Sequence, residues 1–214
     1  DGDRNQVYKI LPSNLCLSGT SEMALAGYFA GSQFKADESP IKVTAVSRCF
    51  RAETSGLTGE KGIYRVHQFT KVEMFSVCRS SQSESMLNEF RDIEISLFNK
   101  LGLHFKLLDM PPNELGAPAY RKYDIEAWMP GRKIWGEISS CSNCSDYQAR
   151  RLNIKFDDEY AHTVNGTACA IPRMLIAIIE TFQREDGTIL IPKELQKYMK
   201  KEKIVRQKIL PELK

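Results

Sequence analysis

The sequence has no long apolar run, little excess charge of either sign and only three histidines among its 214 residues. Its longest strictly apolar run, 174–179, is far shorter than the roughly 20 residues that a membrane-spanning helix requires. Lys and Arg number 30 against 27 Asp and Glu, so composition gives no reason to expect nucleic-acid binding. A hydrophobic content of 42% suffices for a packed core and excludes general disorder. We therefore expect one folded domain, or two small ones, without a membrane span.

The net charge of +3 is unevenly distributed along the chain. Residues 193–214 contain eight Lys and Arg and three Glu, a net +5, which leaves −2 on residues 1–192. The pattern predicts a core over 1–192 and a basic helix or tail over 193–214. A tail of this kind is most often solvated, and contact with the phosphates of a nucleic acid is the alternative.

The six cysteines are scattered, and only Cys141 and Cys144 are close in sequence. Most of the others lie in apolar or strand-like stretches, which is typical of buried, reduced thiols rather than of a disulfide framework. The three histidines have no metal-ligand spacing to Cys141 and Cys144, so the sequence predicts no zinc site.

Hydrophobic periodicity and turn residues predict an α+β domain with a largely antiparallel sheet, because strands outnumber helices and are separated mainly by hairpin-like turns. The expected strands are 42–53, 63–78, 103–109, 123–129 and 133–140, with 162–170 as a strand or turn. The expected helices are 23–28, 83–101, 146–152 and 173–183.

Three of these segments carry more detailed expectations. The glycine-rich segment 54–62 is expected to form the mobile tip of a hairpin between 42–53 and 63–78. The helix 173–183 is apolar on nearly all sides and is therefore expected to be buried. The helix 83–101 is expected to bury one apolar stripe, composed of Leu87, Phe90, Ile93, Leu97 and Leu101.

One expected strand has an unusual face. Alternate residues of a strand point to the same side, so one face of 63–75 would carry Arg65, His67, Phe69, Lys71, Glu73 and Phe75. The preceding strand would place Arg51 and Glu53 on a face that can coincide with it in an antiparallel hairpin. A solvated face with cross-strand ion pairs is the alternative, but it would expose two phenylalanines without need.

Side chains of these types can bind a nucleotide. Arginines hold phosphates bidentately, an aromatic ring stacks on a base, and carboxylates hold a divalent metal or an ammonium group. The sequence has no glycine-rich phosphate loop of the strand-to-helix kind. A nucleotide is therefore expected to lie on the sheet and to be held by side chains. His67 fits a structural hydrogen bond as well as a ligand contact.

Four segments, in order along the chain, carry a family pattern: 17–22 (LSGTSE), 49–53 (CFRAE) with 64–75 (YRVHQFTKVEMF), 137–151 (EISSCSNCSDYQARR) and 165–173 (NGTACAIPR). They resemble the serine-binding loop, motif 2, the signature stretch and motif 3 of class II aminoacyl-tRNA synthetases, specifically of the seryl-tRNA synthetases. The stretches 101–112 and 119–131 are most similar to animal mitochondrial members. The resemblance implies the class II catalytic fold over 1–192, with a mostly antiparallel sheet flanked by helices.

The resemblance also implies a reaction and its partners. ATP would activate L-serine to seryl-adenylate with release of pyrophosphate, and the seryl group would then pass to tRNA(Ser). ATP and Mg²⁺ are the implied cofactors, and a homodimer in the mitochondrial matrix is the implied setting.

Residue by residue, the resemblance implies two binding sets, with Arg51 and Arg173 as the catalytic residues. The implied ATP-binding residues are Arg51, Ala52, Glu53, Arg65, Phe69, Glu137, Ile138, Ser139, Ser140 and Arg173. Of these, Glu137 and Ser140 would hold Mg²⁺ together with ATP. The implied serine-binding residues are Thr20, Ser21, Glu22, Arg51, Glu73 and Thr167.

Two parts of the family pattern have no counterpart before Asp1: the N-terminal helical arm that grips tRNA and the motif 1 that builds the dimer interface. We therefore expect tRNA binding and dimerisation to rest mainly on a part that this chain lacks. Two alternatives share the scaffold, namely a catalytically inactive paralogue that acts as a scaffold or regulator, and a tRNA-independent amino acid:carrier-protein ligase. The presence of all the required ATP and serine residue types favours an active synthetase.

Overall fold

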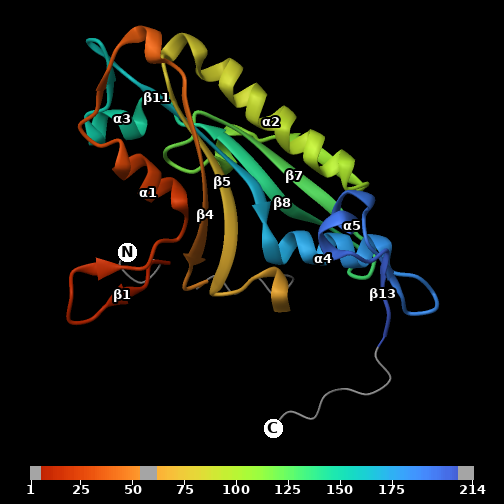
Figure 1. The fold of residues 1–214 in the computed structure, drawn as a ribbon. Helices are drawn as coiled ribbons and strands as arrows, with labels where there is room; N and C mark the ends of the chain where they lie inside the picture. The colour runs from red at the N-terminus through yellow and green to blue at the C-terminus, as the bar shows by residue number, and fades with distance from the viewer. Residues whose placement is uncertain (1–5, 54–61, 207–214) are drawn as a thin grey trace.

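A six-stranded antiparallel sheet in the order β4-β5-β11-β8-β7-β6 forms the centre of the fold (Figure 1). The computed structural model describes residues 6–53 and 62–206. The strands of this sheet are β4 (Ile41–Phe50), β5 (Gln68–Cys78), β6 (Phe105–Asp109), β7 (Arg121–Met129), β8 (Ile134–Asn143) and β11 (His162–Ala170). Every pair of neighbouring strands in it is antiparallel, which confirms the expected α+β architecture.

Helices pack on both faces of the sheet. They are α1 (Ser21–Tyr28), α2 (Ser83–Lys100), α3 (Tyr147–Leu152), α4 (Ile171–Phe182) and α5 (Lys193–Met199). Helix α2 crosses one face against β5, β11 and β8, and α4 lies at the end of the sheet against β7 and β8 (Figure 1). Helices α1 and α3 pack around Phe75 and Val77 on the other face. The rest of that second face holds the cavities described below.

Three small sheets complete the described fold. Their strands are β1 (Lys9–Ile10) with β2 (Leu15–Cys16), β3 (Gln33–Phe34) with β9 (Lys155–Phe156) and β10 (Glu159–Tyr160), and β12 (Ile189–Leu190) with β13 (Lys203–Ile204). Because β13 pairs with β12, the basic C-terminal segment returns to the domain as α5 and β13. The expected tail beyond residue 206 lies outside the described residues.

The hairpin of β4 and β5 has a register that runs from Ile41 opposite Val77 to Phe50 opposite Gln68. The expected strands were therefore too long, by residues 51–53 after β4 and by residues 63–67 before β5. A 3₁₀ turn over Gly62–Tyr64 and a left-handed conformation at Glu53, with φ of 49°, take both segments out of the ladder. Most of the expected hairpin tip, 54–61, lies outside the described residues.

The odd positions of β5 serve two purposes. Phe69, Lys71 and Glu73 point to the open part of the sheet, whereas Phe75 is fully buried beneath the capping residue of α1, where its ring stacks on Phe29. The expectation that Phe75 belongs to the functional face is therefore wrong. The odd side chains in the first half of β5 face the cavities and those in its second half are buried, because α1 covers only the second half of the strand.

Helix α2 buries a different stripe from the expected one. Leu87 and Phe90 are buried as expected, but Ile93 and Leu97 are more than a third exposed. The core position between Phe90 and Phe98 is occupied by Glu94, which is fully buried. The spacing of 87, 90, 94 and 98 follows the helical period, and the hydrophobic pattern missed it because a charged residue occupies one of its positions.

Helix α4 is buried on one side only among the described residues. Met174 and Ala177 pack into the core with Phe98 of α2, whereas Leu175 and Ile179 are 44% and 40% exposed. The expected burial of the whole helix is therefore wrong, because α4 lies at the end of the sheet and meets it along one stripe. No helix within the described ranges combines the length and the apolar character needed to cross a membrane.

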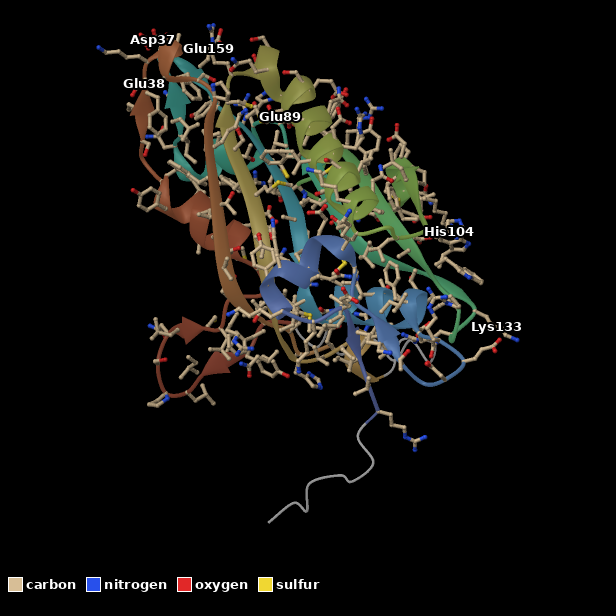
Figure 2. All side chains as sticks on the ribbon, turned by 45° about the vertical axis from the view of Figure 1, so that its right-hand side comes forward. Asp37, Glu38, Glu89, His104, Lys133 and Glu159 are labelled. Atoms are coloured by element: carbon tan, nitrogen blue, oxygen red, sulfur yellow. The ribbon has the colours of Figure 1, made fainter. Side chains whose placement is uncertain are left out.

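The surface carries local charge although the net charge is small. Figure 2 shows Asp37, Glu38 and Glu159 together at one end of the molecule, and His104 and Lys133 at the far end of the long strands.

Four of the six cysteines are buried and Cys16 is exposed, and all six thiols are free.

We predict that Glu94→Leu stabilises the fold near pH 8. Neither carboxylate oxygen of Glu94 makes a hydrogen bond of normal geometry among the described residues, and burial raises its pKa well above the usual range although Ser139 and Cys141 beside it oppose the rise. A folded-state pKa above the unfolded value means that ionisation opposes folding, so the penalty is absent below about pH 4 and grows as the pH rises. Removing an unsatisfied buried polar group should raise the free energy of unfolding by about 1–3 kcal/mol.

Chemical denaturation of both proteins at pH 5 and pH 8 measures this difference. Glu89→Leu is the matched control on the same helix, since Glu89 is exposed and pairs with Lys42, and its effect should not follow the same pH trend. A Glu94→Leu protein that is less stable than the parent at pH 8 would contradict the prediction.

Candidate functional site

Two adjoining cavities open on the sheet face opposite α2. The arginine cavity, lined by Arg51, Arg65 and Arg173, extends over β5 and β8 to the start of α4. The glutamate cavity, lined by Glu22 and Glu73, lies between α1, β5 and β11. Each has a volume of about 270 Å³. Residues that line both cavities define the junction: Arg51, Lys71, Lys122, Ser140 and Thr167.

The junction is rich in cations. Arg51 follows β4, and its Nε donates to the carbonyl of Gly19 at 3.2 Å, which ties it to the loop before α1. Lys71 is on β5, and Lys122 on β7 donates to Asp124 at 2.9 Å. Three cations from three segments thus meet where the cavities join, so the junction favours an anion that extends into both.

The far wall of the arginine cavity is built around Tyr64. Arg173 lies over the Tyr64 ring at 4.6 Å, and its Nη1 is 3.4 Å from a carboxylate oxygen of Glu137. The Tyr64 hydroxyl and the Arg173 guanidinium both donate to the backbone carbonyl of Glu137, at 3.0 and 3.1 Å. Tyr64 therefore fixes the first turn of α4 against β8.

The near wall pairs arginines with acidic and aromatic groups. The Arg65 guanidinium donates to Glu53 at 2.5 Å, and the Arg51 guanidinium is 5.2 Å from the centroid of the Phe69 ring. Arg51 and Glu53 reach the same cavity from beyond the end of β4 rather than from a shared strand face. This distance places Arg51 in cation–π contact with Phe69.

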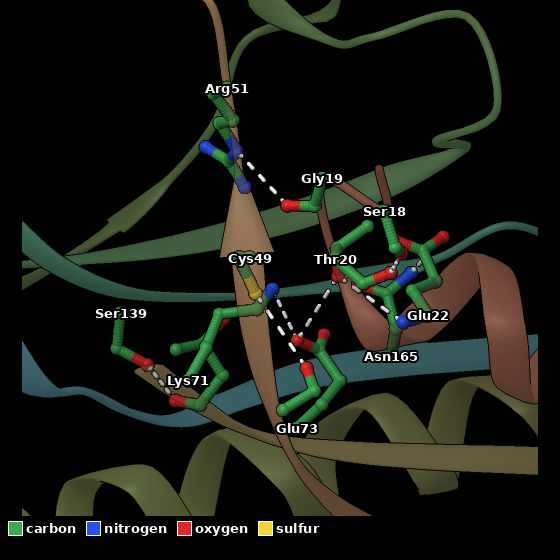
Figure 3. A network of polar contacts seen from close by, with 12 residues as sticks. Ser18, Gly19, Thr20, Glu22, Cys49, Arg51, Lys71, Glu73, Ser139 and Asn165 are labelled. Carbon is green, nitrogen blue, oxygen red and sulfur yellow. Dashed lines mark hydrogen bonds and ion pairs between the residues drawn. The ribbon is translucent and has the colours of Figure 1, made fainter. Parts of the chain in front are cut away.

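The centre of the glutamate cavity is a buried ion pair. Glu73 is 1% exposed and pairs with the ammonium group of Lys71, two residues earlier on β5. Thr20 also donates to the same carboxylate oxygen at 3.4 Å. Burial raises the pKa of Glu73, and the adjacent Lys71 opposes this rise. Figure 3 shows Thr20, Lys71 and Glu73 converging on this point.

Glu22 forms the opposite wall of that cavity. Thr20 caps α1, since its hydroxyl accepts from the backbone N–H of Glu22 at 3.2 Å. The Glu22 carboxylate accepts from Gln148 at 2.7 Å and from Asn165 at 3.1 Å, and Thr163 holds Gln148 in turn at 2.7 Å. Two elements, α3 and β11, thereby orient the Glu22 carboxylate toward the cavity.

The structure brings together nearly all the residues singled out in the sequence. The implied ATP residues that line the arginine cavity are Arg51, Glu53, Arg65, Phe69, Glu137, Ile138, Ser139, Ser140 and Arg173. The implied serine residues that line the glutamate cavity are Thr20, Glu22, Arg51, Glu73 and Thr167. Ser139 is buried, and its hydroxyl donates to the backbone carbonyl of Thr167 at 2.5 Å, which ties β8 to β11.

Ala52 and Ser21 line neither cavity. The backbone N–H of Ala52 donates to the carbonyl of Gln6 at 2.9 Å, and the hydroxyl of Ser21 is buried in α1. His67 also lies outside both cavities. Its Nδ1 is 2.9 Å from the Tyr8 hydroxyl and 3.1 Å from the carbonyl of Arg51. These contacts support a structural hydrogen bond rather than a ligand contact as the role of His67.

Sequence reasoning gave no role to several lining residues. Tyr64 and Lys71 stand inside the motif 2 pattern, and alternation placed Lys71 on the functional face, but nothing indicated their partners. Lys122 gave no signal, because it lies one residue before the expected strand 123–129, whereas β7 begins at Arg121. Within the described ranges, no group of three or more His, Cys, Asp or Glu side chains is arranged to hold a metal ion by itself.

Comparison with known proteins identifies the family. Residues 8–182 match the family described as tRNA synthetase class II core domain (G, H, P, S and T). The chain belongs to this family.

Similar proteins narrow the comparison to one branch. The chain is 49% identical over 219 aligned positions to the mitochondrial serine–tRNA ligase of Mus musculus, and equally to that of Bos taurus; in each case 97% of this chain is covered. It spans 42% of the length of these curated relatives. The seryl-tRNA synthetase of Pyrococcus horikoshii, solved in complex with ATP, is 40% identical with a TM-score of 0.92, over 96% of this chain and 48% of that one.

We predict that Tyr64 acts through its ring more than through its hydroxyl. Tyr64→Phe removes one hydrogen bond and should cost about 1 kcal/mol of stability. Tyr64→Ala removes the surface on which Arg173 lies and a buried ring, and should cost about 3–5 kcal/mol. Urea denaturation measures both values. Equal losses in the two variants would contradict the prediction, because the Tyr64 ring would then add nothing to stability beyond its hydroxyl.

Proposed function

We propose that the protein carrying this chain is a serine–tRNA ligase that activates L-serine with ATP to seryl-adenylate and transfers the seryl group to tRNA(Ser) with release of AMP. One observation carries the proposal, namely the cationic junction that links a cavity of arginines to a cavity of carboxylates. The arginine cavity suits a nucleoside triphosphate, and the glutamate cavity suits a small molecule with an ammonium group. The identities to serine–tRNA ligases over nearly the whole chain support the same assignment.

ATP fits the arginine cavity by chemistry. Arg65 and Arg173 flank the cavity and can hold the outer phosphates, while Phe69 offers a ring for the base beside Glu53. Mg²⁺ would be held by Glu137 and Ser140 together with the phosphates. This donor set suits the ion, because Glu137 is 40% exposed at the cavity and Mg²⁺ commonly takes one or two protein oxygens and completes its shell with phosphates and water.

Serine fits the glutamate cavity. Its ammonium group would lie among Glu73, Glu22 and Thr20, its hydroxyl would reach Glu73 and Thr167, and its carboxylate would point to Arg51 at the junction. A site whose polar groups are buried and need partners rejects an analogue that lacks the hydroxyl, since those groups would stay unpaired. Threonine must be excluded by size.

The reaction follows from positioning and charge. A carboxylate oxygen of serine attacks the α-phosphorus, the bond to the bridging oxygen breaks, and pyrophosphate leaves with the bonding electrons. No nucleophilic side chain and no proton transfer is required. The chain's residues align the two substrates and neutralise the developing negative charge, which are the main contributions to phosphoryl-transfer catalysis.

Three further assignments belong to the whole protein. We propose that tRNA(Ser) is gripped mainly by a part outside this chain, because the chain spans less than half the length of its curated relatives. We propose a homodimer by analogy with the family pattern. The names of the mouse, cow and yeast relatives support a mitochondrial location, and we propose the matrix as the compartment.

We predict serine-dependent exchange of pyrophosphate into ATP by the complete polypeptide. Alanine should support exchange about 10⁴-fold less efficiently than serine in kcat/KM, because the hydroxyl partners would remain unpaired. Arg51→Ala should lower the rate by about 10²–10³, by analogy with the loss of one oriented donor at a developing charge.

The controls for this experiment separate the alternatives. Lys42→Ala, at an exposed ion pair far from the junction, should leave exchange unchanged. Absence of exchange with any amino acid would point to the inactive paralogue. Exchange with serine but no charging of tRNA(Ser) would point to the carrier-protein ligase.

We also predict an acid limb in kcat/KM for serine that lies above the ordinary pKa range of a glutamate. Burial raises the pKa of Glu73, against the opposing influence of Lys71 and Thr20 and with the assistance of Glu22. As the pH falls through this raised pKa, the carboxylate is protonated and loses its attraction for the ammonium group of serine. The other charged side chains that line this cavity are Glu22, Arg51, Lys71 and Lys122.

A pH series of exchange measurements tests the limb, with Glu73→Gln as the comparison. The variant should be about 10²-fold less efficient at neutral pH and should show no such limb, because glutamine does not titrate. A limb of the same position in both proteins would assign it to another group.

A further inference from the structure

Lys71 is the one buried lysine among the described residues, with 7% exposure. It lines both cavities, and its ammonium group pairs with Glu73 at the centre of the glutamate cavity (Figure 3). Its neighbours across the sheet are Ser47 on β4 and Ala170 on β11, neither of which is charged. Glu73 is therefore the group that balances the Lys71 charge in the free protein.

The pair has a clear physical reason. A buried ammonium group and a buried carboxylate are each costly unless they meet a partner, and each satisfies the other here. The partnership conflicts with serine binding, however. Serine brings its own ammonium group between Glu73 and Glu22, where it competes with the Lys71 ammonium group for the Glu73 carboxylate.

The conflict resolves at the junction. When serine takes the carboxylate, Lys71 needs a new anion, and its flexible stem already borders the arginine cavity. In the proposed reaction, the α-phosphate of ATP and the serine carboxylate occupy this place. Both carry the negative charge that the displaced ammonium group requires.

We propose that Lys71 is a movable cation that couples the two cavities: it neutralises Glu73 in the free protein and turns to the reacting phosphate when serine displaces it. The inference rests on the proposed function. In this role Lys71 supplies a positive charge and transfers no proton. It adds positive charge at the α-phosphorus as the carboxylate oxygen attacks and pyrophosphate leaves.

The arrangement makes serine binding and ATP binding cooperative. Occupation of the glutamate cavity releases a cation to the arginine cavity, so a ligand in one site strengthens binding in the other, and the coupling is reciprocal. L-Serinamide is a suitable probe because it carries the ammonium group and the hydroxyl of serine but no carboxylate to react. It should displace Lys71 without consuming ATP.

The experiment measures the Kd of Mg·ATP by calorimetry on the complete polypeptide, with and without saturating L-serinamide. In the parent protein, serinamide should lower the Kd of ATP by about 5–20-fold, within the usual range of such couplings. In Lys71→Met the factor should fall to about 1, and Lys71→Arg should restore most of it. Lys106→Met, at a cross-strand pair with Glu126 outside both cavities, should behave as the parent.

Glu73→Gln gives a second, independent test if Lys71→Met does not fold. Without its carboxylate partner, Lys71 is already available to ATP. The Kd of ATP should therefore be lower than in the parent before serinamide is added, and serinamide should not lower it further. A merely structural role for the pair predicts weaker ATP binding in this variant instead.

The outcomes distinguish this inference from the function on which it rests. A parent protein without serine-dependent exchange overturns the proposed function itself. A parent protein that is active in exchange, but whose coupling persists in Lys71→Met or is absent altogether, overturns the role of Lys71. Serinamide that fails to compete with serine in exchange also counts against it, because the ammonium group and the hydroxyl are the proposed displacing groups.

Discussion

The arrangement of the site depends on the cost of burying a carboxylate. Glu73 is 1% exposed, and a positive charge and a hydrogen-bond donor beside it offset the cost of its burial. The sequence provides these from separate elements, with Lys71 from the same strand and Thr20 from the cap of α1. The requirement therefore fixes how α1 meets β5. It also leaves a polar cavity that only a ligand with complementary charge can fill well.

The sheet extends this local constraint into a two-part site. Antiparallel pairing of β4 with β5 places Arg51, just beyond the end of β4, over Phe69, and the contact of Arg51 with Gly19 ties the same arginine to the loop before α1. From the other side, Tyr64 and the carbonyl of Glu137 hold Arg173. Groups far apart in sequence thus keep fixed positions because each is anchored to a neighbouring strand.

Much of this could be predicted from the sequence, and the failures have physical causes. The family pattern selected most of the residues that line the cavities, and strand alternation correctly placed Phe69, Lys71 and Glu73 on one face of β5. Arg51 and Arg65 lie beyond the strand ends, where alternation does not apply. The pattern could not foresee that Glu94 takes a core position, because a charge at that spacing reads as surface. It also overestimated the burial of α4, because the sequence of an apolar helix does not show whether one side or all sides of it pack against the rest of the protein. Lys122 was missed for lack of any local signal.

One consequence concerns which residues can vary together. Glu94 lies directly beneath Gly166, where a Cβ atom would stand 2.9 Å from its carboxylate oxygen and 3.1 Å from Met74. Gly166 sits between Asn165 and Thr167, so any shift of the strand at this point would move both walls of the glutamate cavity. We therefore expect substitutions at positions 94 and 166 to be epistatic. The amino acid tolerated in the strand depends on the side chain in the helix below it, and the shape of the cavity is set partly by a residue that no ligand touches.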